Sequence, residues 1–288
     1  MIEFRQPEIG DADRLKEVLD EAQPVSCEYS VGNLLGWSRY YCAGIAEVEG
    51  CLVTKISNKN LYGFPQGRNW KAALEKIKKE EGKISFYGLI SAECSKLNSV
   101  FDREYDFRPS RDSYDYVYRR EELARLSGRK YHSKRNHVSY FDKNFDWSYE
   151  EITPESLGEC IKLNEEWFEK RKDASDAGIE TERMVLDFAF NNYKKLNFRG
   201  GLLKADGQTV AFTFGERLND STFVTHFEKA DASVRGAYPM INMLFAQRSL
   251  SDFELINRED DAGSEGLRKA KLSYHPEFMV EKFTAVKL

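Results

Sequence analysis

The most informative stretch of the sequence is NREDDAGSEGLRKAKLSYHP, which spans residues 257–276. It begins where a strand predicted over residues 253–257 ends, and it continues into a helix predicted over residues 264–274. The turn between them holds three consecutive carboxylates: Glu259, Asp260 and Asp261. Because adjacent carboxylates repel one another, at least one is predicted to have a raised pKa if it is partly buried. A strand end of this kind delivers side chains to the edge of a cleft, where they can hold an ammonium group or act as a base.

Helices and strands alternate through the second half of the chain. A helix is predicted to open at Thr153-Pro154, and the turns Asp206-Gly207 and Asn219-Asp220 join three predicted strands. The predicted helices cover residues 153–168, 181–196, 239–247 and 264–274, and the predicted strands cover residues 200–205, 208–217, 222–228, 253–257 and 279–286.

The first half repeats this order of elements. Its predicted helices cover residues 11–22, 70–82 and 91–101, and its predicted strands cover residues 43–48, 51–57, 61–65, 84–89 and 114–118. Each half ends strand–helix–strand after a meander and a helix, which is the order of a GNAT-type acyltransferase fold used twice. We therefore predict an α/β (α+β) protein with tandem duplicated GNAT-like domains, each a mixed, largely antiparallel sheet flanked by helices.

Length and composition agree with two domains. The 288 residues exceed the roughly 150 of an average domain, and 41% of them are hydrophobic. We predict a first domain at residues 1–126 with a structural role, a basic connector at 127–143, and a second domain with the active cleft at 144–288. The net charge of −5 excludes a strongly basic nucleic-acid coat protein and a long acidic disordered chain.

The same composition argues for a cytoplasmic protein. No apolar run approaches the ~20 residues that a membrane span needs, and the first five residues lack the charge pattern of a signal peptide. The five cysteines are scattered, without a Cys-x-x-Cys pair, so neither a disulfide framework nor a structural zinc site is predicted. No metal site is expected.

A second distinctive stretch, SGRKYHSKRNH, covers residues 127–137. Four Lys or Arg residues fall within seven positions there, interleaved with Tyr131 and His132. One interpretation is a solvated linker helix, and the other is an anion site for phosphate or a nucleic-acid backbone.

The two stretches together resemble the signature sequences of the family named for the C-terminal domain of phosphatidylglycerol lysyltransferase. Two intervening segments, THFEKAD at residues 225–231 and GAYPMIN at residues 236–242, are also similar to that family. The resemblance spans essentially the whole chain. Members are similar to the Fem-type aminoacyltransferases, whose tandem GNAT-like domains agree with the duplicated pattern.

The resemblance implies transfer of an aminoacyl group from aminoacyl-tRNA to a hydroxyl or amine acceptor. Aminoacyl-tRNA would be the co-substrate, without a further cofactor. The namesake enzyme modifies a lipid headgroup and carries its catalytic domain on a long membrane-embedded half, which this sequence lacks. The expected acceptor is therefore a lipid, a peptide or a small amine, and a lipid acceptor would bring peripheral contact with a membrane.

The resemblance also assigns residues. Catalytic roles fall to His226, Glu228 and Asp260, and substrate-binding roles to Lys130, His132, Lys134, Arg135, Asn136, Tyr238, Asn242, Asn257, Arg258, Glu259, Arg268, Lys269 and Lys271. The cations would hold phosphates of the donor, and Asp260 or Glu259 would clamp the α-ammonium group. His226 or Glu228 would orient or deprotonate the acceptor, since alternation predicts both on one face of their strand. An aminoacyl ester is already activated, so no covalent intermediate is needed.

Two alternatives stay open. An acyl-coenzyme A N-acyltransferase needs a glycine-rich loop at a helix start to grip a pyrophosphate. The corresponding residues 231–239 read DASVRGAYP, where Arg235 directly precedes Gly236 and Pro239 removes an amide donor, so acetyl-coenzyme A is the less expected substrate. The other alternative is a binding module that kept the fold and lost the chemistry.

Overall fold

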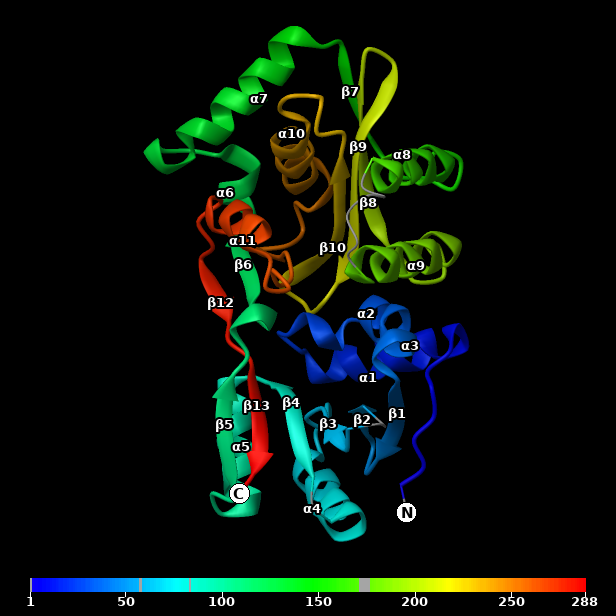
Figure 1. Ribbon diagram of the computed structural model, residues 1–288, viewed down its shortest axis with the longest axis vertical. Coiled ribbons are helices and arrows are strands. Elements are labelled where there is room, and N and C mark those ends of the chain that lie inside the picture. Colours follow the sequence, from blue (N-terminus) through cyan, green and yellow to red (C-terminus); the bar gives the residue numbers. More distant parts are fainter. Residues whose placement is uncertain (1, 57–58, 83, 171–176) are drawn as a thin grey trace. The chain divides into compact units, whose positions relative to one another are not determined.

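The computed structural model describes residues 2–56, 59–82, 84–170 and 177–288 (Figure 1). The chain forms two compact units. The first consists of Met1–Tyr116, Glu259–Lys269 and Phe278–Leu288, and the second consists of Val117–Arg258 and Ala270–Glu277. Two C-terminal segments that the sequence placed in the second domain therefore belong to the first unit.

The first unit is built on a six-stranded sheet of order β1-β2-β3-β4-β13-β5. The neighbours pair antiparallel except for β3 and β4, which are parallel. Its elements are η1(Ile9–Asp11), α1(Ala12–Ala22), η2(Cys27–Tyr29), α2(Val31–Gly36), α3(Ser38–Tyr41), β1(Ala43–Val48), β2(Cys51–Ile56), β3(Leu61–Tyr62), α4(Trp70–Glu81), β4(Ser85–Leu89), α5(Ser91–Phe101), β5(Tyr105–Pro109), η3(Arg111–Ser113) and β13(Phe283–Lys287). Apolar side chains of α4, α5 and β4 form its core, with Leu74, Phe86 and Phe101 buried.

The second sheet has seven strands in the order β12-β6-β11-β10-β9-β8-β7. β10 pairs in parallel with β11 and antiparallel with β9. The elements are β6(Asp115–Arg119), α6(Arg120–Arg125), η4(Arg129–Tyr131), α7(His132–Asn144), β7(Trp147–Glu151), α8(Leu157–Glu169), α9(Ala177–Asn191), β8(Arg199–Ala205), β9(Gln208–Arg217), β10(Thr222–Ala230), α10(Ala237–Leu244), the π-helix η5(Phe245–Ser249), β11(Leu255–Asn257), α11(Glu265–Leu272) and β12(Phe278–Val280). α10 lies on one side of β8–β10, and α8 and α9 lie on the other (Figure 1).

Several predicted elements are confirmed almost residue for residue. The strands at 43–48 and 208–217 and the helix at 91–101 have the predicted bounds. The strand predicted at 51–57 ends at Ile56, and its last predicted residue lies outside the described residues. Turn residues such as Glu49-Gly50 and Asp206-Gly207, or a helix-capping residue such as Ser91, bound these segments, and local sequence suffices to reveal such signals.

Two predictions are wrong in detail, and one strand was not predicted. The final strand predicted at 279–286 is two strands in different sheets, β12 and β13, separated at Lys282, whose side chain is fully buried. The strand β5 was not predicted: Tyr105 and Phe107 alternate with charged residues, but the run is only five residues long and ends in Pro109. The helix predicted to open at Thr153 begins at Leu157.

The residues predicted to be a connector form a helix of the second unit. Residues 127–143 contain η4 and most of α7, which packs against α10 through Phe141. No helix among the described residues is long and apolar enough to span a membrane.

Gly236 is required where α7 meets the start of α10. Its φ of +94° favours glycine, and a Cβ atom there would lie 2.4 Å from the carbonyl oxygen of His137 and 2.9 Å from Cβ of Phe141. The backbone of α7 cannot yield as a flexible side chain would. Glycine therefore lets the two helices approach closely, which places α7 beside the strands that carry the candidate site.

We expect Gly236→Ala to lower the free energy of unfolding by about 3 kcal/mol, from left-handed backbone strain plus steric overlap. Gly207→Ala is the matched control, because Gly207 has a φ of +77° but open space around its Cβ position. Gly207→Ala should lower the free energy of unfolding only by the backbone strain, about 1–2 kcal/mol. Urea unfolding measures both, and equal losses would contradict the packing role of Gly236.

Candidate functional site

A carboxylate on β10 joins two polar side chains of the second unit. Glu228 accepts a hydrogen bond at 2.9 Å from Arg258 Nη2 and one at 3.1 Å from Asn242 Nδ2. Arg258 directly follows β11, the parallel neighbour of β10, and Asn242 lies on α10. The side chains of Glu228 and Arg258 are each 12% exposed, so the ion pair is largely removed from water. We call Glu228, Arg258 and Asn242 the Glu228 cluster.

Two aromatic rings and a second cation surround this cluster. The Arg258 guanidinium carbon lies 5.7 Å from the centre of the Tyr118 ring and 4.9 Å from that of Tyr274. Lys134 Nζ, on α7, lies 3.9 Å from the same Tyr274 ring centre. Aromatic faces attract cations, so the Tyr274 ring helps to hold both side chains near each other despite their like charges.

The surroundings of Lys134 change its acid–base behaviour. Burial lowers the pKa of its ammonium group to about 8, the positive charge of Arg258 adds to this effect, and the Glu228 carboxylate opposes it. The amine therefore changes charge just above neutral pH. It can hold an anion when protonated and accept a proton when neutral.

Two polar atoms of the Glu228 cluster are left without a hydrogen-bond partner among the described residues. They are Arg258 Nη1 and Asn242 Oδ1, and both are buried. A buried donor or acceptor that stays unpaired costs about 1–3 kcal/mol. A ligand that supplies one acceptor and one donor at this place would remove that cost.

Hydrogen bonds from neighbouring side chains support the backbone next to the cluster. Lys271 Nζ donates a 2.5 Å hydrogen bond to the carbonyl oxygen of Arg258, and Tyr118 Oη donates one of 2.8 Å to the carbonyl of Lys271. Asn257 is completely buried at the end of β11. These contacts fix the position from which Arg258 extends.

The structure places His226 in a different environment from Glu228. A β-bulge between Thr225 and Phe227 breaks the strict alternation that predicted both side chains on one face. His226 Nε2 lies 2.9 Å from Glu216 Oε1 on β9, and its side chain is only 2% exposed. His226 is therefore part of a buried pair with Glu216.

The basic stretch contributes one residue, Lys134, to the surroundings of the Glu228 cluster. Lys130 forms an ion pair with Glu122 at 2.9 Å, and Arg135 Nη1 donates to the carbonyl oxygens of Leu126 and Gly128. The exposed residues His132 and Asn136 face each other one helical turn apart on α7. These contacts stabilise the start of α7 and the loop before it.

The acidic turn belongs to the first unit. Asp261 is completely buried and accepts hydrogen bonds from Tyr116 Oη at 2.5 Å and from Arg268 Nη2 at 2.8 Å, and Arg111 lies 3.2 Å away. Burial alone would raise the pKa of Asp261, but the hydrogen bonds from Arg268 and Tyr116 hold it well below its usual range. The pKa of Asp261 is therefore lowered, whereas the sequence predicted a raised pKa for at least one of the three carboxylates in this turn.

The rest of the acidic turn is structured by local contacts. Glu259 Oε1 accepts a 2.8 Å hydrogen bond from Asn33, and Asp260 Oδ1 accepts one of 3.0 Å from the amide of Ala262. Glu259 and Ala262 both have positive φ, of 55° and 46°, so the turn is tightly constrained. Lys269 is 82% exposed and lies 3.9 Å from Glu265, at the surface.

Tyr238 lies one turn before Asn242 on α10. Its hydroxyl accepts a 3.3 Å hydrogen bond from Trp167 Nε1 of α8. Tyr238 thus lies on the same face of α10 as Asn242, but its hydroxyl contacts α8 rather than the Glu228 carboxylate.

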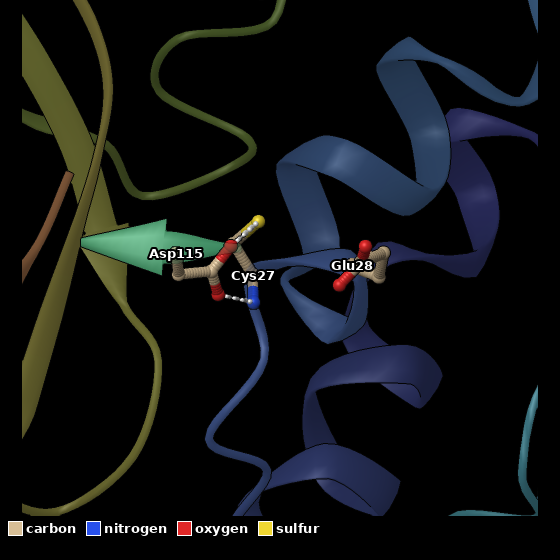
Figure 2. A group of neighbouring side chains, drawn as sticks. All are labelled: Cys27, Glu28 and Asp115. Carbon is tan, nitrogen blue, oxygen red and sulfur yellow. Dashed lines mark hydrogen bonds between the residues drawn. The ribbon is translucent and has the colours of Figure 1, made fainter. Parts of the chain in front are cut away.

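A second buried ionic group, in the first unit, was not predicted. Figure 2 shows Asp115 accepting hydrogen bonds from the amide of Cys27 at 2.9 Å and from its thiol at 3.1 Å, with Glu28 nearby. The ligand atoms of these three residues lie within 4.8 Å of one another, as a metal site would require. Lys282 Nζ, however, lies 2.5 Å from Asp115 Oδ1 and 2.7 Å from Glu28 Oε2. The ammonium group already supplies the positive charge, so the geometry fits a lysine ion cluster better than a metal centre.

Comparison with known proteins now identifies the family. The model of the family "Phosphatidylglycerol lysyltransferase, C-terminal" matches residues 20–286. The chain belongs to this family. The match takes in both units, including the Glu228 cluster and the acidic turn.

Solved structures share the fold of this chain. A conserved protein of unknown function from Bacteroides thetaiotaomicron is 36% identical, with full coverage of both chains and a TM-score of 0.93. L-PGS from Bacillus licheniformis is 14% identical over 96% of this chain and 91% of its own, with a TM-score of 0.66. FemX is 10% identical over 100% of this chain and 98% of its own, with a TM-score of 0.58. The latter two likenesses establish the tandem GNAT-like fold.

An uncharacterized protein of Mycoplasmoides gallisepticum is 27% identical over 202 residues. The alignment covers 68% of this chain and 62% of that relative, so the match spans less than two thirds of the relative's length.

Within this family member, sequence reasoning found four residues that the structure brings together: Lys134, Glu228, Asn242 and Arg258. It missed Tyr118 and Tyr274, the two rings that hold the cations. Tyr274 lies within the stretch 257–276, and Tyr118 ends the strand predicted at 114–118. An aromatic residue at such a place is usually a core residue, so the signal was weak.

The acid–base behaviour of Lys134 can be measured directly. Only a neutral amine reacts with acetic anhydride, so Lys134 should become reactive with a midpoint near pH 8. Mass spectrometry of peptides labelled between pH 6 and 11 measures this, with the exposed Lys162 of α8 as the reference in the same samples. A Lys134 midpoint equal to that of Lys162 would contradict the proposed environment.

Proposed function

We propose that this protein is an aminoacyltransferase that moves an aminoacyl group from aminoacyl-tRNA to a hydroxyl or amine acceptor. The observation that carries the proposal is the Glu228 cluster, with its spare donor and acceptor, in a member of the phosphatidylglycerol lysyltransferase C-terminal family. The name of the family describes an aminoacyl transfer, and the proposal assigns a reaction of this class to this chain.

The chemistry of the cluster suits an aminoacyl ester. Attack by the acceptor on the ester carbonyl places negative charge on the carbonyl oxygen, and a guanidinium N–H at Arg258 Nη1 can stabilise that charge in a partly buried setting. The new bond joins the acceptor oxygen or nitrogen to the carbonyl carbon. The bond to the 3′ oxygen of the tRNA breaks, and the proton lost by the acceptor ends on that oxygen.

The charge around the site suits a polyanionic donor. Lys134 and Arg258 place two positive charges beside the one carboxylate of Glu228. Phosphates next to the terminal adenosine would be attracted to that excess, most strongly when Lys134 is protonated. We assign Lys134 to this role, whereas His226 and Asp260 have no step in the proposed reaction.

The acceptor is proposed only by class. A lipid headgroup with a free hydroxyl, a peptide amine or a small amine would each satisfy the reaction, and a lipid would require peripheral contact with a membrane. Charged tRNA is a cytoplasmic molecule, so the proposed reaction places the protein in the cytoplasm.

A coenzyme A substrate is less well supported. Such a donor would need free backbone amides at the start of α10, where a loop before the helix grips the pyrophosphate. Here the carbonyl oxygen of His137 lies against Gly236 at that start, and Pro239 lacks an amide hydrogen.

The test is a transfer assay with tRNA charged with labelled amino acids and three acceptors: phosphatidylglycerol vesicles, a peptide and a small amine. We expect transfer to at least one acceptor. Glu228→Gln and Arg258→Lys should each lower kcat/KM about 100-fold, because each removes charge or geometry needed in the transition state.

The matched control is Lys162→Ala, an exposed position on α8 that should leave transfer unchanged. Saturable acetyl-coenzyme A binding with acetyl transfer, and no aminoacyl transfer to any acceptor, would overturn the proposal.

A further inference from the structure

We infer that the Glu228 cluster selects donors with a free, protonated α-amino group and rejects donors whose α-nitrogen is acylated. The inference rests on the proposed function, because it concerns the donor of that reaction. It goes further by assigning each atom of the donor's reacting end to an atom of this site.

The first argument is the orientation of the Asn242 amide. Its Nδ2 donates to Glu228 Oε2, so its Oδ1 necessarily points elsewhere. A flipped amide would set an oxygen against a carboxylate oxygen, which is repulsive. Asn242 is only 6% exposed, and its Oδ1 has no partner among the described residues. The cluster therefore contains a buried acceptor with a fixed orientation.

The second argument is the position of the unused donor. Arg258 uses Nη2 to bind Glu228 Oε1, and its Nη1 is buried without a partner in the described part of the chain. Both unused atoms belong to groups that bind the same carboxylate. The site thus offers, around one negative charge, an unused acceptor on one side group and an unused donor on the other.

An α-aminoacyl ester matches this arrangement. Its ammonium group has three N–H donors and a positive charge, which suit the Glu228 carboxylate and Asn242 Oδ1. Its carbonyl oxygen is an acceptor, which suits Arg258 Nη1. The same contacts that recognise the ammonium group therefore bring the reacting carbonyl to the guanidinium.

Acylation of the α-nitrogen destroys the match. The nitrogen loses its charge and two of its three donors, so Glu228 would be left facing a neutral amide. The added carbonyl also introduces an oxygen next to the carboxylate. The site should therefore distinguish the two donors by charge and not by size alone.

Binding of stable donor analogues tests the inference without requiring transfer. The probes are 3′-alanylamino-3′-deoxyadenosine and 3′-lysylamino-3′-deoxyadenosine, each with its Nα-acetyl derivative, measured by calorimetry at pH 7. We expect each free-amine probe to bind the wild-type protein at least tenfold more tightly than its acetylated form.

Two variants test which residues are responsible. Glu228→Gln should reduce the tenfold preference to less than threefold, and Asn242→Leu should weaken the free-amine probes while leaving the acetylated probes unaffected. Lys162→Ala should retain the wild-type preference. Circular dichroism shows whether each variant folds. If Glu228→Gln does not fold, the binding of the probes to Asn242→Leu still tests the inference.

The outcomes separate this inference from the proposed function. Equal affinity for free and acetylated probes, a preference that survives both variants, or no binding of either probe would overturn the inference. Selective binding without any transfer from charged tRNA would overturn the proposed function and leave the site assignment standing. Transfer at equal rates from free and from N-acetylated aminoacyl-tRNA would support the proposed function and overturn the inference.

Discussion

A buried arginine must be paired, and the ion pair of Arg258 with Glu228 governs the arrangement of the second unit. Arg258 follows the last residue of β11, so its position depends on the parallel pairing of β11 with β10. Removing one partner of such a pair typically costs 3–5 kcal/mol. The strand pairing, the amide of Asn242 on α10 and the close approach of α7 at Gly236 all serve to place groups around this one pair.

The buried lysine of the first unit shows what a purely structural ion cluster looks like by comparison. Lys282 Nζ contacts Asp115, Glu28 and the Cys27 sulfur, so the three N–H donors of its ammonium group have three partners. Burial and the neighbouring Asp115 charge raise the pKa of the Cys27 thiol well above its usual value, which makes it a poor nucleophile. Arg258, in contrast, keeps an unused donor, and this difference is the physical reason to place function at the Glu228 cluster.

Sequence reasoning predicted what depends on local pattern and failed where distant segments meet. The turns Asp206-Gly207 and Asn219-Asp220 predicted the bounds of β9 as a ten-residue strand. No local signal shows that β13 inserts between β4 and β5, because that pairing joins segments far apart in the chain. The same limit applies to the site. Family resemblance pointed to Glu228 and Arg258, whereas the β-bulge that turns His226 toward Glu216 depends on the pairing of β10 with β9.

The central claim is that the Glu228 cluster receives the aminoacyl end of the donor. A crystal structure of the protein with a 3′-aminoacylamino-3′-deoxyadenosine tests it most directly. The account predicts the α-ammonium group within hydrogen-bond distance of Glu228 and Asn242 Oδ1, and the aminoacyl carbonyl oxygen at Arg258 Nη1. An analogue bound with its ammonium group at Glu259 or Asp260, and no contact with Glu228 or Arg258, would contradict it.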